Sequence, residues 1–154
     1  MFERAVLLIA LLLSMPSSAA GLGVAACISM DSEGPALRFA IANDTGGSIS
    51  IPKSNLPWRE DGAIVIAYRG DALIGKVMKR AYPVQDSVAD NVILRNGEKK
   101  TGELVLKYLY PEFAKLDDSS SVIILWAYVP HGNSAEDVTF GGALTLRDKD
   151  RCAK

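Results

Sequence analysis

The chain has 154 residues, of which 49% are hydrophobic and 23% are charged, and its formal net charge is −1. This balance argues against intrinsic disorder, which needs few apolar residues and a high net charge. The 17 Lys and Arg residues are offset by 18 Asp and Glu residues. The composition therefore argues against a nucleic-acid-binding protein, and the length predicts a single domain.

Residues 1–20 have the pattern of a secretory signal peptide. An unbroken apolar run extends from Ala5 to Leu13, Pro16 ends it, and small residues lead to a predicted cleavage after Ala20. The run is about half as long as a membrane span, which needs about 20 apolar residues. The sequence therefore predicts an exported protein, periplasmic or secreted. Its mature domain is residues 21–154, without a transmembrane segment.

The two cysteines lie near the two ends of the mature chain, at Cys27 and Cys152. An even number of cysteines in an exported protein predicts a disulfide, and here only one intramolecular pairing is possible. That bond would join a first strand to a last one. Two cysteines and one histidine are too few for the usual zinc site, so no metal or cofactor is predicted. As an alternative, Val24 to Cys27 resembles a lipobox, in which Cys27 would carry a lipid anchor and Cys152 would stay unpaired.

Strand patterns begin early in the mature chain. Residues 36–42 and 48–51 alternate in hydropathy on either side of a polar turn, which predicts a hairpin. The turn begins at Asn43 and contains a glycosylation sequon, Asn43-Asp44-Thr45. In residues 62–69 one face carries Ile64, Ile66 and Tyr68.

The middle of the chain is more irregular. Residues 72–80 read as an edge strand, which Lys76, Lys79 and Arg80 would protect from pairing with other chains. Residues 91–95 and 102–108 read as strands separated by a loop that contains Asn96-Gly97. Pro111 is placed to open a helical turn over residues 111–116.

The C-terminal part contains the most apolar segment of the mature chain. Residues 121–129 are apolar at both even and odd positions, which is typical of a central strand covered on both faces. A last strand follows, with Val138, Phe140, Leu144 and Leu146 on one face, and Gly141-Gly142 is interpreted as a bulge. No sustained helical period occurs in the mature chain.

Seven to nine short strands, with turns between them, predict an all-β fold, specifically an antiparallel β-sandwich. A small closed barrel is the alternative. The chain resembles immunoglobulin-like or fibronectin-like sandwiches of exported bacterial proteins in the strand and turn 37–45, in Asn96-Gly97-Glu98 before a strand, and in Trp126. The resemblance covers residues 24–150 and implies the fold, although immunoglobulin domains join inner strands by their disulfide. The strand layout also resembles small bacterial proteinase-inhibitor sandwiches.

Candidate catalytic residues are few. His131, the only histidine, lies three residues before Ser134 and is followed by Glu136 and Asp137, which could orient it as a general base. Ser134 lacks the G-x-S-x-G elbow, however, and His131 is interpreted as an exposed loop residue. The carboxylates that pair along the chain have no calcium-loop spacing and are interpreted as solvated. These pairs are Asp117-Asp118, Glu136-Asp137 and Asp148 with Asp150.

Trp58 and Arg59, in the segment Leu56-Pro57-Trp58-Arg59, are the candidate binding residues, because Trp and Arg are enriched in interface hot spots. The alternative is that Trp58 closes one end of the sandwich. The predicted function is non-enzymatic binding of a protein or an envelope component. Three alternatives stay open: an inhibitor of a secreted hydrolase that acts through residues 54–61, a small hydrolase, and an envelope lipoprotein anchored at Cys27.

Overall fold

The computed structural model describes residues 21–59, 61–70, 76–82, 90–116, 120–131, 138–148 and 152. A three-stranded antiparallel sheet contains β1 (Leu22–Asp31), β2 (Gly34–Asn43) and β7 (Lys99–Val105), in the order β1-β2-β7. β1 and β2 form a long hairpin that the sequence analysis did not predict. Their pairing runs without interruption from Leu22 opposite Asn43 to Asp31 opposite Gly34.

A four-stranded antiparallel sheet has the order β5-β4-β8-β9. Its strands are β4 (Ile64–Arg69), β5 (Lys76–Val77), β8 (Val122–Tyr128) and β9 (Phe140–Thr145). This confirms the predicted strand in 62–69, the edge position of the segment around Lys76, and the central position of the apolar run in 121–129. The predicted bulge at Gly141-Gly142 is wrong, because β8 and β9 pair one to one through both glycines.

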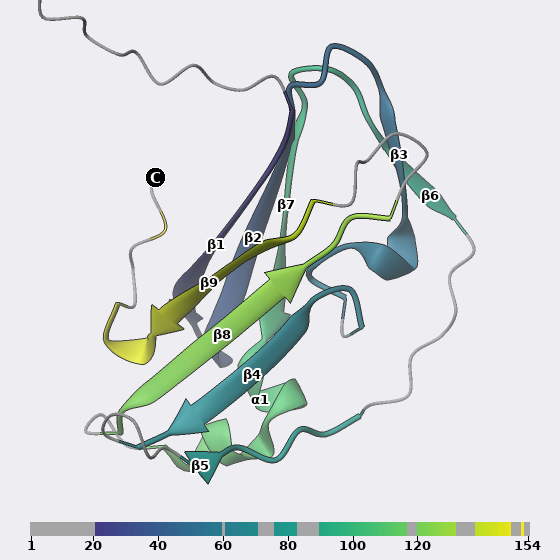
Figure 1. Cartoon of the computed structure of the whole chain (residues 1–154). Coiled ribbons are helices and arrows are strands. Elements are labelled where there is room, and N and C mark those ends of the chain that lie inside the picture. Colours follow the sequence, from purple (N-terminus) through teal and green to yellow (C-terminus); the bar gives the residue numbers. More distant parts are fainter. Residues whose placement is uncertain are drawn as a thin grey trace, which may run out of the picture.

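A short ribbon formed by β3 (Ile49–Pro52) and β6 (Asn91–Leu94) extends to one side of the two larger sheets (Figure 1). The predicted hairpin between residues 36–42 and 48–51 is therefore wrong. β2 pairs with β1 and β7, whereas β3 pairs with β6. Hydropathy alternation locates strands, but partners far away in the chain decide which strands pair.

Asn43 ends β2, at the point where the chain leaves the three-stranded sheet for the ribbon of β3 and β6. It is 0% exposed, and its amide Nδ2 donates to the carbonyls of Gly47 and Leu94 at 2.8 and 2.9 Å. Its Oδ1 accepts from the backbone N and the hydroxyl of Thr45 at 3.1 and 2.7 Å. The sequon asparagine is thus a buried junction residue whose amide nitrogen is already engaged in the folded chain.

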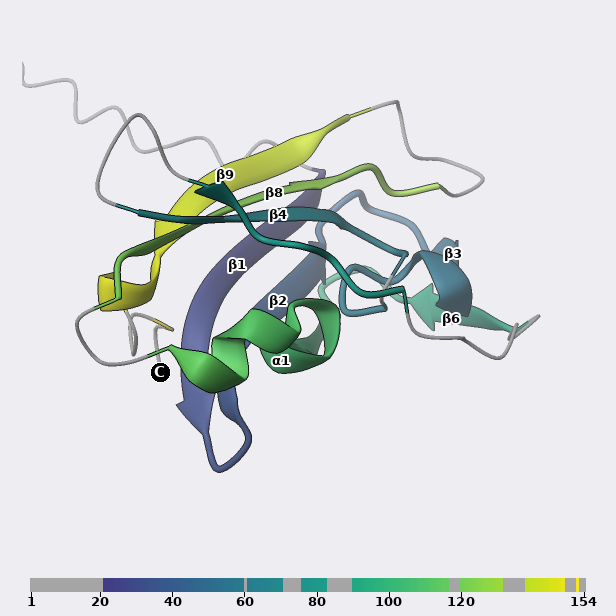
Figure 2. The same ribbon diagram turned by 90° about the horizontal axis from the view of Figure 1, so that it is seen from below.

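The two larger sheets face each other, with the four-stranded sheet in front in Figure 1 and the three-stranded sheet behind it. Their facing sides form the hydrophobic core, in which the rings of Phe39 and Trp126 meet edge to face at 5.5 Å. Helix α1 (Leu106–Leu109) lies on the same side of the four-stranded sheet, from here on called the front sheet, as β1 and β2 (Figure 2). It is followed by a 3-10 turn, η2 (Pro111–Lys115), which matches the helical turn predicted at Pro111.

Two shorter 3-10 turns complete the described structure: η1 (Lys53–Asn55) after β3 and η3 (Leu146–Asp148) after β9. The fold is therefore all-β, as predicted, with only short helical segments. None of the described sheets closes on itself, so the closed alternative is not observed. No helix in the described ranges is long and apolar enough to cross a membrane. The predicted signal peptide, residues 1–20, lies outside the described residues.

Candidate functional site

The front sheet has two faces of similar hydrophobicity, but only one of them is buried. On the core side, Val65 and Ala67 of β4 and every second residue of β8 from Val122 to Tyr128 are buried. On the other side, Ile64 is 63% exposed and Leu125 is 38% exposed. No described helix or strand covers that side (Figures 1 and 2).

The strand register arranges the side chains of this uncovered side in three rows, which we call the outer face. The first row is Ile64, Ala127 and Gly141, and the second is Ile66, Leu125 and Ala143. The third row is Tyr68, Ile123 and Thr145, with Val77 of β5 beside Tyr68. Each row crosses the sheet from β4 through β8 to β9.

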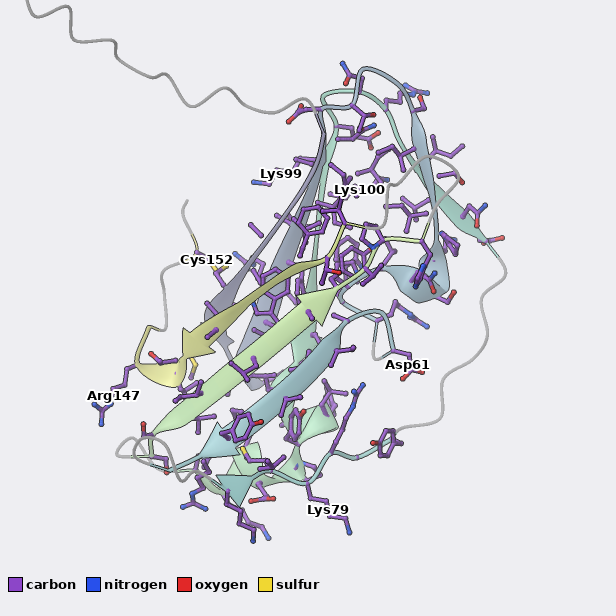
Figure 3. All side chains as sticks on the ribbon, viewed as in Figure 1. Asp61, Lys79, Lys99, Lys100, Arg147 and Cys152 are labelled. Atoms are coloured by element: carbon purple, nitrogen blue, oxygen red, sulfur yellow. A yellow bond between two sulfur atoms is a disulfide. The ribbon has the colours of Figure 1, made fainter. Side chains whose placement is uncertain are left out.

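None of these ten residues is charged, and only Tyr68 and Thr145 have a polar atom in the side chain. The labelled charged residues Asp61, Lys79 and Arg147 lie around the margin of the front sheet and not over its middle (Figure 3). Soluble proteins rarely expose contiguous apolar patches larger than roughly a few hundred Å² unless the patch is a binding surface. The outer face is therefore the candidate functional site of the described structure.

The outer face lies on strands that are paired with their neighbours. β8 is paired along its length with β4 on one side and with β9 on the other. Directly beneath it, Trp126 is buried between the sheets and contacts Phe39. A preformed surface of this kind binds with little loss of backbone conformational entropy, because its backbone is already held by the ladder.

The sequence candidate Trp58 is half-buried and packs against the core. Its indole ring lies so close to Gly102 of β7 that a Cβ atom there would overlap the ring. Leu56 and Pro57, which precede it, are buried as well. This packing is what the alternative interpretation expects, in which Trp58 closes one end between the sheets.

Arg59, the second candidate binding residue, is half-buried. Its Nε atom is buried and has no hydrogen-bond partner in the described part of the chain. Its backbone N and O take part in the turns that connect Leu56 to Gly62. The structure thus places Trp58 and Arg59 in one connecting segment and does not bring them to the outer face.

Cys27 of β1 and Cys152 form the disulfide that the sequence predicts, with their Cα atoms 5.2 Å apart. Cys27 is partly buried and lies opposite Arg38 of β2. A lipid thioether at Cys27 would exclude this bond, because it uses the same sulfur atom. The bond joins the middle of the first strand to a residue that follows β9 and η3, so the expected link to the last strand itself is wrong.

His131, the candidate base, is exposed in the segment that follows β8. Ser134, Glu136, Asp137 and Asp117-Asp118 lie outside the described residues, as does Asp150. For Asp148 the structure describes the backbone, in η3. Within the described ranges, no group of three or more His, Cys, Asp or Glu residues is arranged to hold a metal ion.

Both halves of the outer face are visible in the sequence as strand patterns, although the uncovered surface that they form is not. Ile64, Ile66 and Tyr68 were assigned to one face of a strand, and the run 121–129 was assigned to a strand covered on both sides. A second covering layer needs a helix or sheet to supply it, and residues 21–154 have no sustained helical period. A strand that is apolar on both faces in such a chain indicates an uncovered apolar surface.

A scan of protein-family models gives no match to this chain, and no curated protein matches it significantly.

Proposed function

We propose that this protein is an exported, non-enzymatic binding module that holds its partner against its outer face. The apolar run Ala5 to Leu13 supports export, since its length and the small residues after it are those of a signal peptide. The disulfide between Cys27 and Cys152 supports a periplasmic or secreted location, because such bonds persist in oxidising compartments. The partner is a protein or another component of the cell envelope.

We also propose that the two facing sheets form an immunoglobulin-like sandwich. Two antiparallel sheets with a shared apolar core support this assignment. The terminal position of the disulfide sets the chain apart from immunoglobulin domains, in which the bond joins inner strands.

The observation that carries the functional proposal is the composition of the outer face. Eight of its ten residues are apolar or glycine, none is charged, and Ile64 and Val77 are each more than half exposed. Interfaces differ from the rest of the surface in the depletion of charged residues at their centre. The outer face has this property, and its charged neighbours at the margin correspond to the polar rim of an interface.

The same structure weakens the two alternatives that depend on Trp58 and on lipidation. An inhibitor that acts through residues 54–61 needs a protruding segment, but Leu56 and Pro57 are buried and Trp58 packs on Gly102. An anchor at Cys27 needs a sulfur atom that the disulfide already uses.

The proposal is tested with a matched pair of variants, Ile64→Asp and Ile93→Asp. Both isoleucines lie in strands, Ile64 in β4 and Ile93 in β6, and they are 63% and 60% exposed. Each variant is used to capture proteins from the native envelope and secreted fractions, with quantification by mass spectrometry. We expect a partner that is retained by the wild type and by Ile93→Asp and is depleted at least tenfold with Ile64→Asp.

The thermal midpoints of both variants are measured first, so that loss of folding is not mistaken for loss of binding. Because both side chains are largely in solvent, both midpoints should stay close to that of the wild type. Equal retention of every captured protein by the two folded variants would rule out the outer face as the binding surface.

A further inference from the structure

We infer that the outer face also binds a second copy of the chain, face to face, about a two-fold axis that runs along β8. This inference rests on the proposed function only in using the same surface. It adds a regulatory consequence, because self-association and partner binding would then exclude each other. The supporting observations are the heights of the side chains, the absence of charge and the size of the face.

The outer face slopes from one side of the sheet to the other. In the first row the residues shrink from Ile64 through Ala127 to Gly141. In the second row Ile66 and Leu125 are of equal size, and the row then falls to Ala143. The third row shows the same trend, from Tyr68 through Ile123 to Thr145. In every row the side chain over β4 is therefore larger than the side chain over β9.

Two copies of a face with this slope fit together when one copy is rotated by a half-turn relative to the other. A two-fold axis along β8 lays β4 of one copy over β9 of the other, so that tall side chains meet low ones in both halves of the contact. Such an isologous contact uses the same patch twice and closes at two copies. Strands of the two sheets then run in roughly the same direction, as in aligned sheet packing.

The charges do not oppose this contact. All three rows are uncharged, so two copies of the outer face can meet without repulsion between like charges. The cations of β4 and β5 are Arg69 and Lys76, which lie opposite each other. Arg69 is also in register with Val122, whose side chain is buried in the core, and it therefore belongs to the other face of the sheet.

The size of the face sets the strength of the contact. Five residues of a strand span roughly 15 Å and four strands span a similar width, so the patch is roughly 15 by 15 Å. Stable interfaces bury at least about 1,200 Å² in total, which is more than two such patches provide without help from their margins. We therefore expect a weak, concentration-dependent dimer that a larger partner surface can displace.

Sedimentation velocity of the intact disulfide-bonded protein, from low micromolar to near-millimolar concentration, tests whether a dimer forms. The wild type and Ile93→Asp should shift toward the dimer together as concentration rises. Leu125→Asp, which places a charge next to the axis, should remain a monomer at every concentration. A wild type that stays monomeric throughout, or a folded Leu125→Asp that dimerises like the wild type, overturns the inference.

Cysteine cross-linking tests the orientation without depending on that variant. The axis places Ile66 of one copy over Ala143 of the other, about 10 Å away across the two packed sheets. A mixture of Ile66→Cys and Ala143→Cys proteins should therefore be linked to each other by a short bis-maleimide reagent, since the distance is too long for a direct disulfide. Each variant alone should link poorly, because two copies of Ile66 would be offset by two strand spacings as well as by the spacing between the sheets, about 14 Å in all. Efficient linking of Ile66→Cys to itself would place β4 on β4 and contradict the proposed axis.

The two proposals fail separately. A monomeric protein whose partner capture is lost in Ile64→Asp rejects the dimer and keeps the function. A dimer linked between Ile66 and Ala143, in a protein that captures no partner through Ile64, rejects the function and keeps the dimer.

Discussion

Two buried tyrosines show that a hydroxyl group has opposite effects on stability with and without a hydrogen-bond partner. The Tyr110 hydroxyl donates to the carbonyl of Val65 at 2.5 Å. The hydroxyl of Tyr128, which is 1% exposed, has no hydrogen-bond partner in the described structure, and burial raises the pKa of Tyr128 to about 12. A buried polar group without a partner costs about 1–3 kcal/mol, whereas a made hydrogen bond contributes about 1 kcal/mol.

We therefore expect Tyr110→Phe to lower the free energy of unfolding by about 1 kcal/mol and Tyr128→Phe to leave it unchanged or raise it. Urea unfolding at neutral pH measures both variants. A raised pKa in the folded state also means that the stability linked to Tyr128 is complete below pH 10 and is lost as the pH rises toward 12. Tyr128→Phe should reduce this alkaline loss, and a loss as large as in the wild type would contradict the assignment.

The contact between Trp58 and Gly102 decides whether the aromatic residue is structural. A Cβ atom at position 102 would overlap the indole ring, so Gly102→Ala should cost about 1–3 kcal/mol of stability. In a Trp58→Leu background the same change should cost much less, because the overlapping ring is gone. Gly23→Ala in β1 is the matched control, since a Cβ atom there makes only ordinary contacts. Equal costs in both backgrounds would show that Trp58 does not occupy this position.

At the scale of elements, the junction around Asn43 controls the path of four strands. β2 continues into β3, and β6 continues into β7. The two connecting segments are joined by hydrogen bonds in which Asn43 N donates to Glu98 O and Gly97 N donates to Asn43 O. Gly97 adopts a φ of 77°, a conformation that favours glycine. Buried polar residues with every group paired often specify one arrangement of the chain.

Asn43→Ala should lower the free energy of unfolding by about 2–3 kcal/mol, because the carbonyls of Gly47 and Leu94 lose their donor inside the protein. Asn96→Ala is the control from the same junction, since its exposed bond to Gly46 N is replaced by water. Denaturant unfolding compares the two variants. Similar small losses for both would mean that Asn43 is not the residue that holds the junction.

At the scale of the whole molecule, the disulfide between Cys27 and Cys152 spans a sequence separation of 125 residues. A cross-link over so long a loop restricts the unfolded chain and is worth about 5 kcal/mol in the chain-entropy model. Reduction should therefore lower the free energy of unfolding by about that amount. The double variant Cys27→Ser and Cys152→Ser should have the same low stability with or without reductant. If reduction leaves the unfolding midpoint unchanged, the bond does not contribute in this way.

The outer face belongs to the same scale, because no single strand contains it. Ile64, Leu125 and Ala143 are separated by 61 and 18 residues in the chain and become neighbours only through the register of β4, β8 and β9. The parity of Ile64, Ile66 and Tyr68 could be read from local alternation. Which side of the strand faces water could not, because that depends on where the second sheet packs.

Several features of this protein follow from its sequence alone. The all-β class, the positions of β4 and β8, the helical turn at Pro111 and the single possible disulfide each depend on local alternation, on proline or on a count of cysteines. The pairing of β2 with β7 and of β3 with β6, the burial of Asn43 and Trp58, and the uncovered outer face were decided only by the tertiary structure. Local patterns specify how a strand can be buried, but its partners are set by long-range contacts whose free energies depend on the whole fold.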